Sequence, residues 1–229
     1  MKFTWLGHSG FRIEIADQVL LLDPWLDNPL FDPDRRAEAL AGATHILLTH
    51  GHFDHAMGVL EMAKELSIPV VGSFDFVNYW SEAHSIEGVG FNKGGTVQLG
   101  EVAVTMVQAV HSSSLTTEHG PMYMGGEAGY VLEAEGKRVY ISGDTDVTMD
   151  MELIQALHEP EIGVLCCGGH FTMDMKRAAY AAKRFFKFKT VIPCHYRTFP
   201  LLEQSAEVLT QGLPGVDVIE PEVMEPIEL

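Results

Sequence analysis

Five short apolar runs in this 229-residue sequence are each followed by a histidine or an aspartate. The runs have the length and residue types of buried strands and are bounded by turn residues. Strand ends at one edge of a sheet lie close together, so the five polar side chains are expected to converge on a rigid scaffold there. They are Asp23 after "VLLL", His50 after "HILLT", His111 after "VTMVQAV", Asp144 after "VYISG" and His195 after "TVIPC".

The rest of the chain alternates strands with helices in two similar halves, without a linker rich in Gly, Pro or Ser. This order predicts an α/β protein, a four-layer αββα sandwich, with residues 1–229 as a single domain of two pseudo-repeated halves. Residues 81–95 carry no predicted element, and residues 112–127 are expected to form an exposed loop, with an active-site lid as the alternative. Strands are expected at 2–7, 11–17, 19–25, 43–50, 69–74, 162–169 and 190–196, hairpins at 96–111 and 129–144, and helices at 54–66, 151–159 and 174–187.

The formal net charge is −17, from 15 basic and 32 acidic residues. Such a charge repels polyphosphate backbones, so no nucleic-acid partner is expected. The one basic cluster, Lys176 to Lys189, is interpreted as the solvated face of a helix. The N-terminus does not resemble a signal peptide, and no apolar run reaches the roughly 20 residues that span a bilayer. These features predict a cytoplasmic protein without a membrane partner.

Three cysteines, Cys166, Cys167 and Cys194, are too few and too irregular in number for a disulfide framework, which is consistent with a reducing compartment. They are interpreted as small buried apolar residues. Strand alternation predicts that Cys194 faces away from whatever its neighbour His195 faces.

The stretch "THGHFDHAMG" places His50, His52, Asp54 and His55 within six positions, directly after a buried strand. A protein core excludes this mixture, because each unpaired buried polar group costs several kcal/mol. Imidazoles and carboxylates without thiolates suit Zn²⁺, Mn²⁺ or Fe²⁺. His50 and His52 can face one ion from an irregular turn, and Asp54 and His55 can face a second. Asp144 is suitably placed to bridge the two.

The stretch also resembles the H-x-H-x-D-H signature of the metallo-β-lactamase superfamily. "LLLDPW", "AVHSSS", "ISGDT" and "VIPCHY" resemble the other motifs of that superfamily in the same chain order. "WLGHSGFRIE" and "GGHFTMD … IPCHYRTFP" are similar to the UPF0173-type metal-dependent hydrolases, relatives of L-ascorbate-6-phosphate lactonase and of the N-acyl-phosphatidylethanolamine phospholipase D type. Cys166, Cys167 and Cys194 depart from the usual pattern, with an expected effect on packing only.

The resemblance implies a metallo-β-lactamase-type sandwich and two metal ions, Zn or Mn with Fe as a further option. It assigns His50, His52 and His111 to the first metal and Asp54, His55 and His195 to the second, with Asp144 bridging. It gives Asp23 a supporting role, holding a ligand imidazole by a hydrogen bond without itself being a ligand. The implied reaction is hydrolysis of a small ester, lactone or phosphoester by a metal-bridging hydroxide, with Asp54 or Asp144 taking the proton.

Four residues outside the ligand set are predicted to contact the small-molecule substrate. His8 lies in the turn "GHSG" and is expected at the rim of the site, in contact with the substrate or with a residue that supports the site, with a plain structural role as the alternative. His170 opens a loop before a helix, where an anion can bind. Tyr196 and Arg197 follow the ligand His195 and are predicted to bind an anionic group. Loop packing or surface ion pairing is the alternative for the last three.

Three other functions stay open at this point. A mononuclear iron oxygenase could use a subset of the same histidines, and a non-catalytic metal-binding protein would need only the ligands. A nuclease is disfavoured by the charge of −17. Metal analysis distinguishes the oxygenase from the hydrolase, since one iron with oxygen consumption differs from two Zn²⁺ or Mn²⁺. The sequence has no signature of oligomeric state, so a homo-oligomer stays open.

Overall fold

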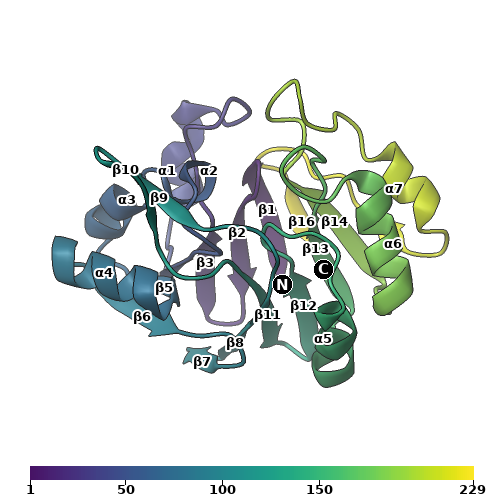
Figure 1. Cartoon of the computed structure of the whole chain (residues 1–229), viewed down its shortest axis with the longest axis horizontal. Helices are drawn as coiled ribbons and strands as arrows, with labels where there is room; N and C mark the ends of the chain where they lie inside the picture. Colours follow the sequence, from purple (N-terminus) through teal and green to yellow (C-terminus); the bar gives the residue numbers. More distant parts are fainter.

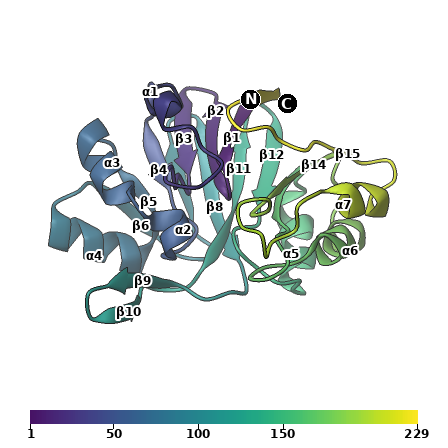
Figure 2. The ribbon, with the colours of Figure 1, turned by 90° about the horizontal axis from the view of Figure 1, so that it is seen from above.

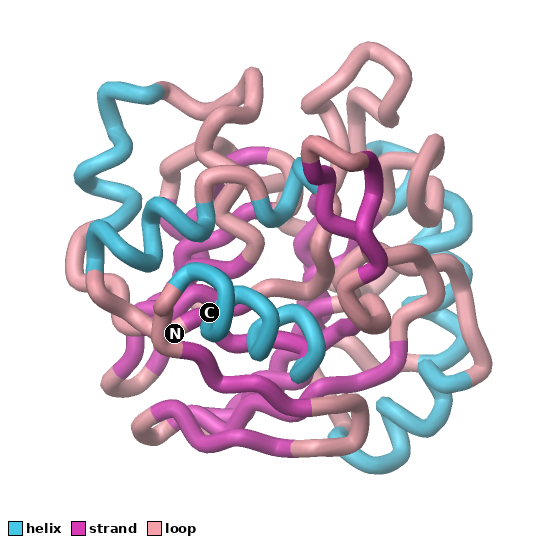
Figure 3. Tube along the Cα trace, turned by 60° about the vertical axis from the view of Figure 1, so that its left-hand side comes forward, coloured by secondary structure: helices cyan, strands magenta, loops and turns pink.

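A computed structural model describes all residues from 1 to 229 as two seven-stranded sheets that face each other, with helices on the outer side of each. Figure 1 shows the helices of the first half on the left and those of the second half on the right. Figure 3 shows the strands lying between helices on both flanks. The predicted four-layer αββα architecture is therefore confirmed.

The two sheets have the same pattern of strand pairing. In each sheet, the three pairings counted from one edge are antiparallel, and the three counted from the opposite edge are parallel. The first sheet has the order β16 (Pro226–Glu228), β1 (Lys2–Gly7), β2 (Gly10–Ile15), β3 (Gln18–Leu22), β4 (His45–Leu47), β5 (Val70–Ser73), β6 (Gly88–Phe91). The second has the order β15 (Asp217–Val218), β14 (Thr190–Cys194), β13 (Ile162–Cys166), β12 (Lys137–Ile141), β11 (Ala128–Ala134), β8 (Val102–Gln108), β7 (Thr96–Leu99).

Helices cover the outer face of each sheet. On the first sheet they are α1 (Arg36–Leu40), α2 (Phe53–Ala56), α3 (Val59–Leu66) and α4 (Phe74–His84), with a short 3-10 helix at Pro33–Arg35. On the second they are α5 (Asp150–His158), α6 (Met175–Phe185) and α7 (Glu207–Gly212). As Figure 2 shows, the two chain ends lie together, because β16 pairs with β1. None of the helices combines the length and apolar character needed to cross a membrane.

The apolar strand runs are explained by burial on both faces. Leu20 and Leu22 of β3 belong to the large cluster between the two sheets, whereas Leu21 packs towards α3 and α4. Successive side chains of a strand point to opposite faces, so a strand covered on both sides is apolar throughout. The large cluster also continues through the second sheet to α6.

Three local predictions differ from the structure. The helix expected over 54–66 is interrupted at Met57 and Gly58, where Gly58 has a φ of 78°, and forms α2 and α3. Helix α4 extends into the segment that carried no predicted element, with Phe76, Val77 and Trp80 buried. The segment 112–127 is not an irregular loop, because it contains the hairpin of β9 (Ser114–Thr117) and β10 (Gly120–Tyr123).

The cysteines are buried and unpaired, as expected. Burial raises the pKa of the Cys166 thiol to about 12, so this sulfur is a neutral packing group. Helix α6 buries its alanines and leaves Lys176, Arg177 and Arg184 exposed, which agrees with the predicted solvated basic face.

Candidate metal centre

The polar residues that follow β3, β4, β12 and β14 meet at one edge of the two sheets. β3 is parallel to β4, and β12 to β14 run parallel, so their carboxyl ends lie on the same side. A backbone hydrogen bond of 2.9 Å from His195 N to His8 O joins the second sheet to the first at this edge. His8, Asp23 and His195 have positive φ angles of 53°, 40° and 57°. Such strain in non-glycine residues is characteristic of functional sites.

A first set of imidazoles consists of His50, His52 and His111. His50 Nε2 and His52 Nδ1 face each other at 2.9 Å, and the three ligand atoms all lie within 4.8 Å of one another. Ligand atoms on one tetrahedral zinc ion lie roughly 3.3 Å apart, given Zn–N bonds of about 2.0 Å. The spacing of this set is therefore suitable for one ion.

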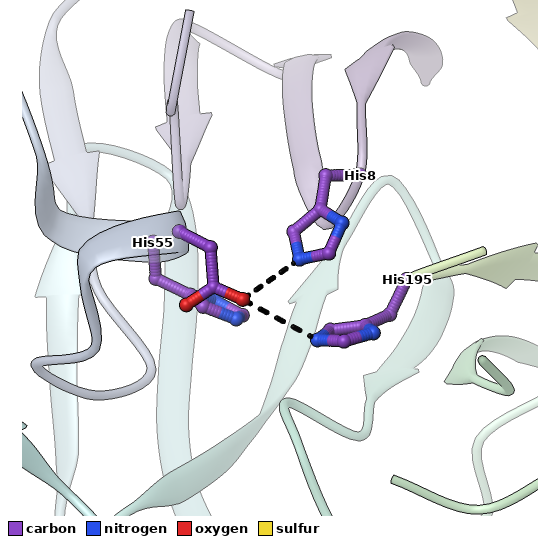
Figure 4. A group of neighbouring side chains, drawn as sticks. His8, His55 and His195 are labelled. Carbon is purple, nitrogen blue, oxygen red and sulfur yellow. Dashed lines mark hydrogen bonds and ion pairs between the residues drawn. The ribbon is translucent and has the colours of Figure 1, made fainter. Parts of the chain in front are cut away.

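A second set of ligand atoms comes from Asp54, His55 and His195, together with His8. Asp54 Oδ2 lies 3.0 Å from His8 Nε2 and 3.7 Å from His195 Nε2. Dashed lines mark these two contacts in Figure 4, where His8, His55 and His195 surround one carboxylate.

One oxygen of Asp144 lies between the two sets. Asp144 Oδ2 is 3.1 Å from His195 Nε2 and 3.3 Å from His55 Nε2. The same oxygen is 3.6 Å from His111 Nε2 and 3.9 Å from His50 Nε2. This carboxylate is fully enclosed and faces both sets at once.

Asp23 holds Thr49 and His55 in position through direct contacts of its carboxylate. Its Oδ1 accepts a hydrogen bond from the Thr49 backbone N–H at 2.8 Å, and its Oδ2 accepts one from the Thr49 hydroxyl at 2.6 Å. Oδ2 also lies 2.8 Å from His55 Nδ1. This contact orients the ring so that His55 Nε2 points to Asp144.

Protonation differs between the two sets. Burial and the neighbouring imidazole of His55 hold the pKa of His50 well below its usual range, and burial lowers the pKa values of His52 and His111. These rings are neutral, with lone pairs available for coordination. Burial also acts on His195 and His55, but Asp144 outweighs it, raising the pKa of His195 to about 9 and that of His55 well above its ordinary value. The Asp144 carboxylate therefore stabilises a positive charge next to His195 and His55, whether a bound proton or a metal cation carries that charge.

Several buried atoms at the centre of the cluster have no hydrogen-bond partner. They are His55 Nε2, both ring nitrogens of His195 and Asp144 Oδ1. A buried polar atom without a partner costs about 1–3 kcal/mol, and such orphans are rare in folded proteins. Imidazole nitrogen and carboxylate oxygen are ligands for Zn²⁺, Mn²⁺ and Fe²⁺. The cluster thus fits a divalent metal centre.

A cavity of about 470 Å³ opens onto the cluster. Its floor contains His52, Asp54, His111, Asp144 and His195, and its walls are Phe53, Ser112, Phe171, Phe199 and Leu201. The volume falls within the range of small-molecule sites.

His8 lies beneath this cavity and not at its rim. The residue is fully buried, with Nε2 on Asp54 and Nδ1 2.8 Å from the Thr198 hydroxyl. Burial and the nearby His195 lower the pKa of His8 to about 4, so the ring is neutral. The predicted place of His8 at the rim does not fit this geometry, whereas contact with a residue that builds the site does.

The other three residues predicted to contact the substrate do not line the cavity either. His170 is exposed and lines a neighbouring hollow that shares Leu201 with the cavity, and its ring lies 4.5 Å from the ring of the wall residue Phe171. Tyr196, beyond the end of β14, is buried and stacks on Trp5 at 5.7 Å. Arg197 lies over the Trp5 ring and pairs with Glu222 at 3.7 Å. The predicted contact of Tyr196 and Arg197 with the substrate has no support in this geometry, and that of His170 stays a prediction.

The residues that form the cavity walls were not predicted from the sequence. Phe53 is inside the histidine signature, Phe171 follows His170, and Phe199 and Leu201 lie beyond Arg197. A large apolar residue in a polar loop next to a ligand was the available signal, because such residues are costly to expose unless they serve binding.

Comparisons with known proteins were consistent with this site. The profile of the Beta-lactamase superfamily domain matches residues 2–195. A UPF0173 metal-dependent hydrolase from Dinoroseobacter shibae is 66% identical over 230 residues, and one from Paracoccus denitrificans is 63% identical, both covering 100% of each chain. Among solved structures, a metallo hydrolase from Ignicoccus hospitalis has a TM-score of 0.83 at 29% identity and covers 100% of this chain and 98% of its own. An isothiocyanate hydrolase from Delia radicum gut bacteria shares the fold, with a TM-score of 0.77 at 16% identity, covering 100% and 99%.

Proposed function

This chain belongs to the metallo-β-lactamase superfamily of metal-dependent hydrolases, and on that premise we propose that two divalent cations, Zn²⁺ or Mn²⁺, act together in its site on a small ester, lactone or phosphoester. The observation that carries the proposal is the position of Asp144 Oδ2, between 3.1 and 3.9 Å from imidazoles of both sets. A carboxylate oxygen in that position can be shared by two cations.

In this proposal His50, His52 and His111 hold the first cation, and Asp54, His55 and His195 hold the second, with Asp144 shared. Asp23 keeps His55 oriented through the 2.8 Å contact with its Nδ1. When bound, the cations would acidify a water molecule from a pKa of about 15.7 towards 7 and polarise the substrate oxygen that gains charge.

The side chains of the protein supply the remaining chemistry. Asp54 faces the cavity, and although burial opposes ionisation, its contacts with His195 and His8 hold its pKa well below the usual range. Asp54 is therefore ionised next to the substrate. From its position we assign it as the group that takes a proton, with Asp144 as the alternative. The walls of the cavity position the substrate and limit the access of bulk water.

Metal analysis combined with chelation tests the proposal. The protein is expected to contain two equivalents of metal per chain and to hydrolyse esters until a chelator removes them. Zn²⁺ or Mn²⁺ should restore the activity and stabilise the fold by about 4 kcal/mol for each site at a thousandfold excess over its Kd. A single iron accompanied by oxygen consumption would instead identify an oxygenase, and metal without turnover would identify a binding protein.

Replacement of His8 tests its supporting role. His8→Ala removes the 3.0 Å contact with Asp54 and is expected to weaken metal binding at the second set about tenfold, since contacts that orient a ligand typically contribute 10- to 100-fold. His8→Gln keeps a hydrogen-bonding group and should recover part of the affinity. Thr198→Val removes the contact on His8 Nδ1 and the hydrogen bond that the Thr198 hydroxyl donates to Tyr196 O, but leaves His8 Nε2 next to Asp54. It is the matched control, with a smaller expected loss. Wild-type metal affinity in His8→Ala, measured by competition with a chelating dye, would contradict the assignment.

A further inference from the structure

The mouth of the cavity is formed by large apolar side chains that remain partly open to solvent. Phe53, Phe171 and Leu201 are 46%, 53% and 54% exposed, and Phe199 is half-buried beside them. They come from the start of α2, from the loop after β13 and from the loop after β14, so residues from both halves of the chain meet here. Neighbouring exposed apolar residues around a concave site are characteristic of a binding surface for an apolar ligand.

These aromatic walls are supported from behind. Trp25 is almost fully buried, and its ring meets the Phe53 ring at 5.6 Å and 78° and the Phe199 ring at 6.0 Å and 34°. The His8 ring lies 5.7 Å from the Phe199 ring and 5.4 Å from the Trp25 ring. Aromatic pairs at these separations stabilise one another. The Phe53 and Phe199 walls are consequently held in place before a ligand arrives.

The cavity has no built site for an anionic group apart from the metal ligands. No lysine or arginine is among its lining residues. The two arginines closest in sequence to the wall loops are engaged elsewhere, since Arg197 contacts Trp5 and Glu222 and Arg177 pairs with Asp146 at 2.7 Å. The net charge of −17 further disfavours the approach of phosphorylated molecules.

From these observations we infer that the substrate is a neutral carboxylic ester or lactone that carries an apolar chain or ring, and that phosphoesters are excluded. This inference rests on the proposed hydrolytic function and narrows its substrate class. Attack joins a water oxygen to the acyl carbon, and the bond from that carbon to the alkoxy oxygen breaks. One water proton passes by way of Asp54 to the leaving oxygen, and the acid product releases the other to solvent, so no redox partner is needed.

A series of p-nitrophenyl esters with one leaving group tests the inference. For the metal-loaded protein, kcat/KM is expected to rise about fourfold per added methylene from acetate through butyrate to hexanoate, the increment for burying one CH₂ group. p-Nitrophenyl phosphate and bis(p-nitrophenyl) phosphate should be hydrolysed at least about 100-fold more slowly than the hexanoate. Titration calorimetry with hexanoate and acetate as product ligands measures the same preference without turnover, and hexanoate is expected to bind more tightly.

Substitutions of residues at the cavity mouth test whether these residues cause the preference for a longer acyl chain. Leu201→Ala and Phe171→Ala are expected to lower kcat/KM for the hexanoate about tenfold and to lower the acetate value by a smaller factor, so that the preference for the longer acyl chain falls. Leu157→Ala, an exposed leucine on α5 far from the cavity lining, is the matched control and should change neither value.

The inference would be overturned if kcat/KM were the same across the ester series, or if hexanoate and acetate bound equally well. Faster hydrolysis of the phosphates than of the hexanoate ester would also overturn it. If the hydrolysis seen in those cases is still abolished by chelation, the proposed function stands. Absence of any chelator-sensitive hydrolysis would refute the proposed function, and the calorimetric comparison would then decide the apolar preference separately.

Discussion

Asp144→Asn is expected to abolish hydrolysis, with a fall in kcat/KM of roughly 10³-fold or more, and to reduce the bound metal to at most one equivalent. The substitution preserves the shape of the side chain but removes the charge that faces His195, His55, His111 and His50. A neutral amide binds a cation weakly and cannot be shared by two, and metal chemistry contributes several kcal/mol to such a reaction. Metal content and the rate of ester hydrolysis measure both effects.

The loss of Asp144 also affects the metal-free fold. Burial alone would raise the pKa of this carboxyl, but His195 and His55 hold it well below its usual range. A depressed pKa in the folded state means stability that is present above the unfolded value near 3.8 and is lost as the pH falls below it. Denaturant melts of the chelated Asp144→Asn protein are therefore expected to show lower stability at pH 7 and a weaker loss on acidification.

Asp146→Asn is the matched control for both measurements. Asp146 lies two residues away on the surface and pairs with the half-exposed Arg177. Surface ion pairs contribute 0–1 kcal/mol at most, so activity within about twofold of wild type is expected. Two equivalents of metal and substantial turnover in Asp144→Asn would show that this carboxylate does not link the two sets.

Gly168→Ala is expected to lower activity about 100-fold without altering any ligand. A Cβ atom at this position would lie 2.0 Å from the carbonyl oxygen of His195 and 3.0 Å from its Nδ1. The backbone of His195 would have to move by roughly 1 Å, a displacement that typically costs about 100-fold when it misplaces a catalytic group. Overpacking of this kind also lowers the free energy of unfolding by about 1–3 kcal/mol. Metal affinity, kcat/KM and a denaturant melt report the effects.

Gly126→Ala serves as the control for a glycine near the site. A Cβ atom there would meet only the flexible end of Lys93 at 3.4 Å, so metal binding and activity should stay near wild type. If Gly168→Ala bound metal and turned over substrate normally, the position of His195 would be less critical than the geometry indicates.

The residues of the candidate metal centre could be predicted from the sequence because their chemistry is local. His50, His52, Asp54 and His55 occupy one short turn, and His111, Asp144 and His195 each follow an apolar run. Both signals depend only on residue type and on spacing along the chain. The sandwich was predictable for the same reason, since strands and helices have different apolar periods.

The elements that were missed depend on packing between distant segments. Helix α4 mixes aromatic and polar residues, and it is stabilised by burying Phe76, Val77 and Trp80 against the first sheet. Local spacing also gave no sign that Tyr196 stacks on Trp5 or that Arg197 pairs with Glu222, and the predicted roles of both relied on their being adjacent to His195.

The order of residues along the chain by itself determined which side chains are available as ligands and that they stand at strand ends, because ligand chemistry and strand periodicity are short-range properties. Only the tertiary structure decided that His8 lies buried against Asp54, that Tyr196 packs on Trp5, and that Phe171 and Leu201 form the cavity mouth. These features arise where the two sheets and their loops pack against each other, and side-chain packing across long sequence separations is not encoded in any local pattern.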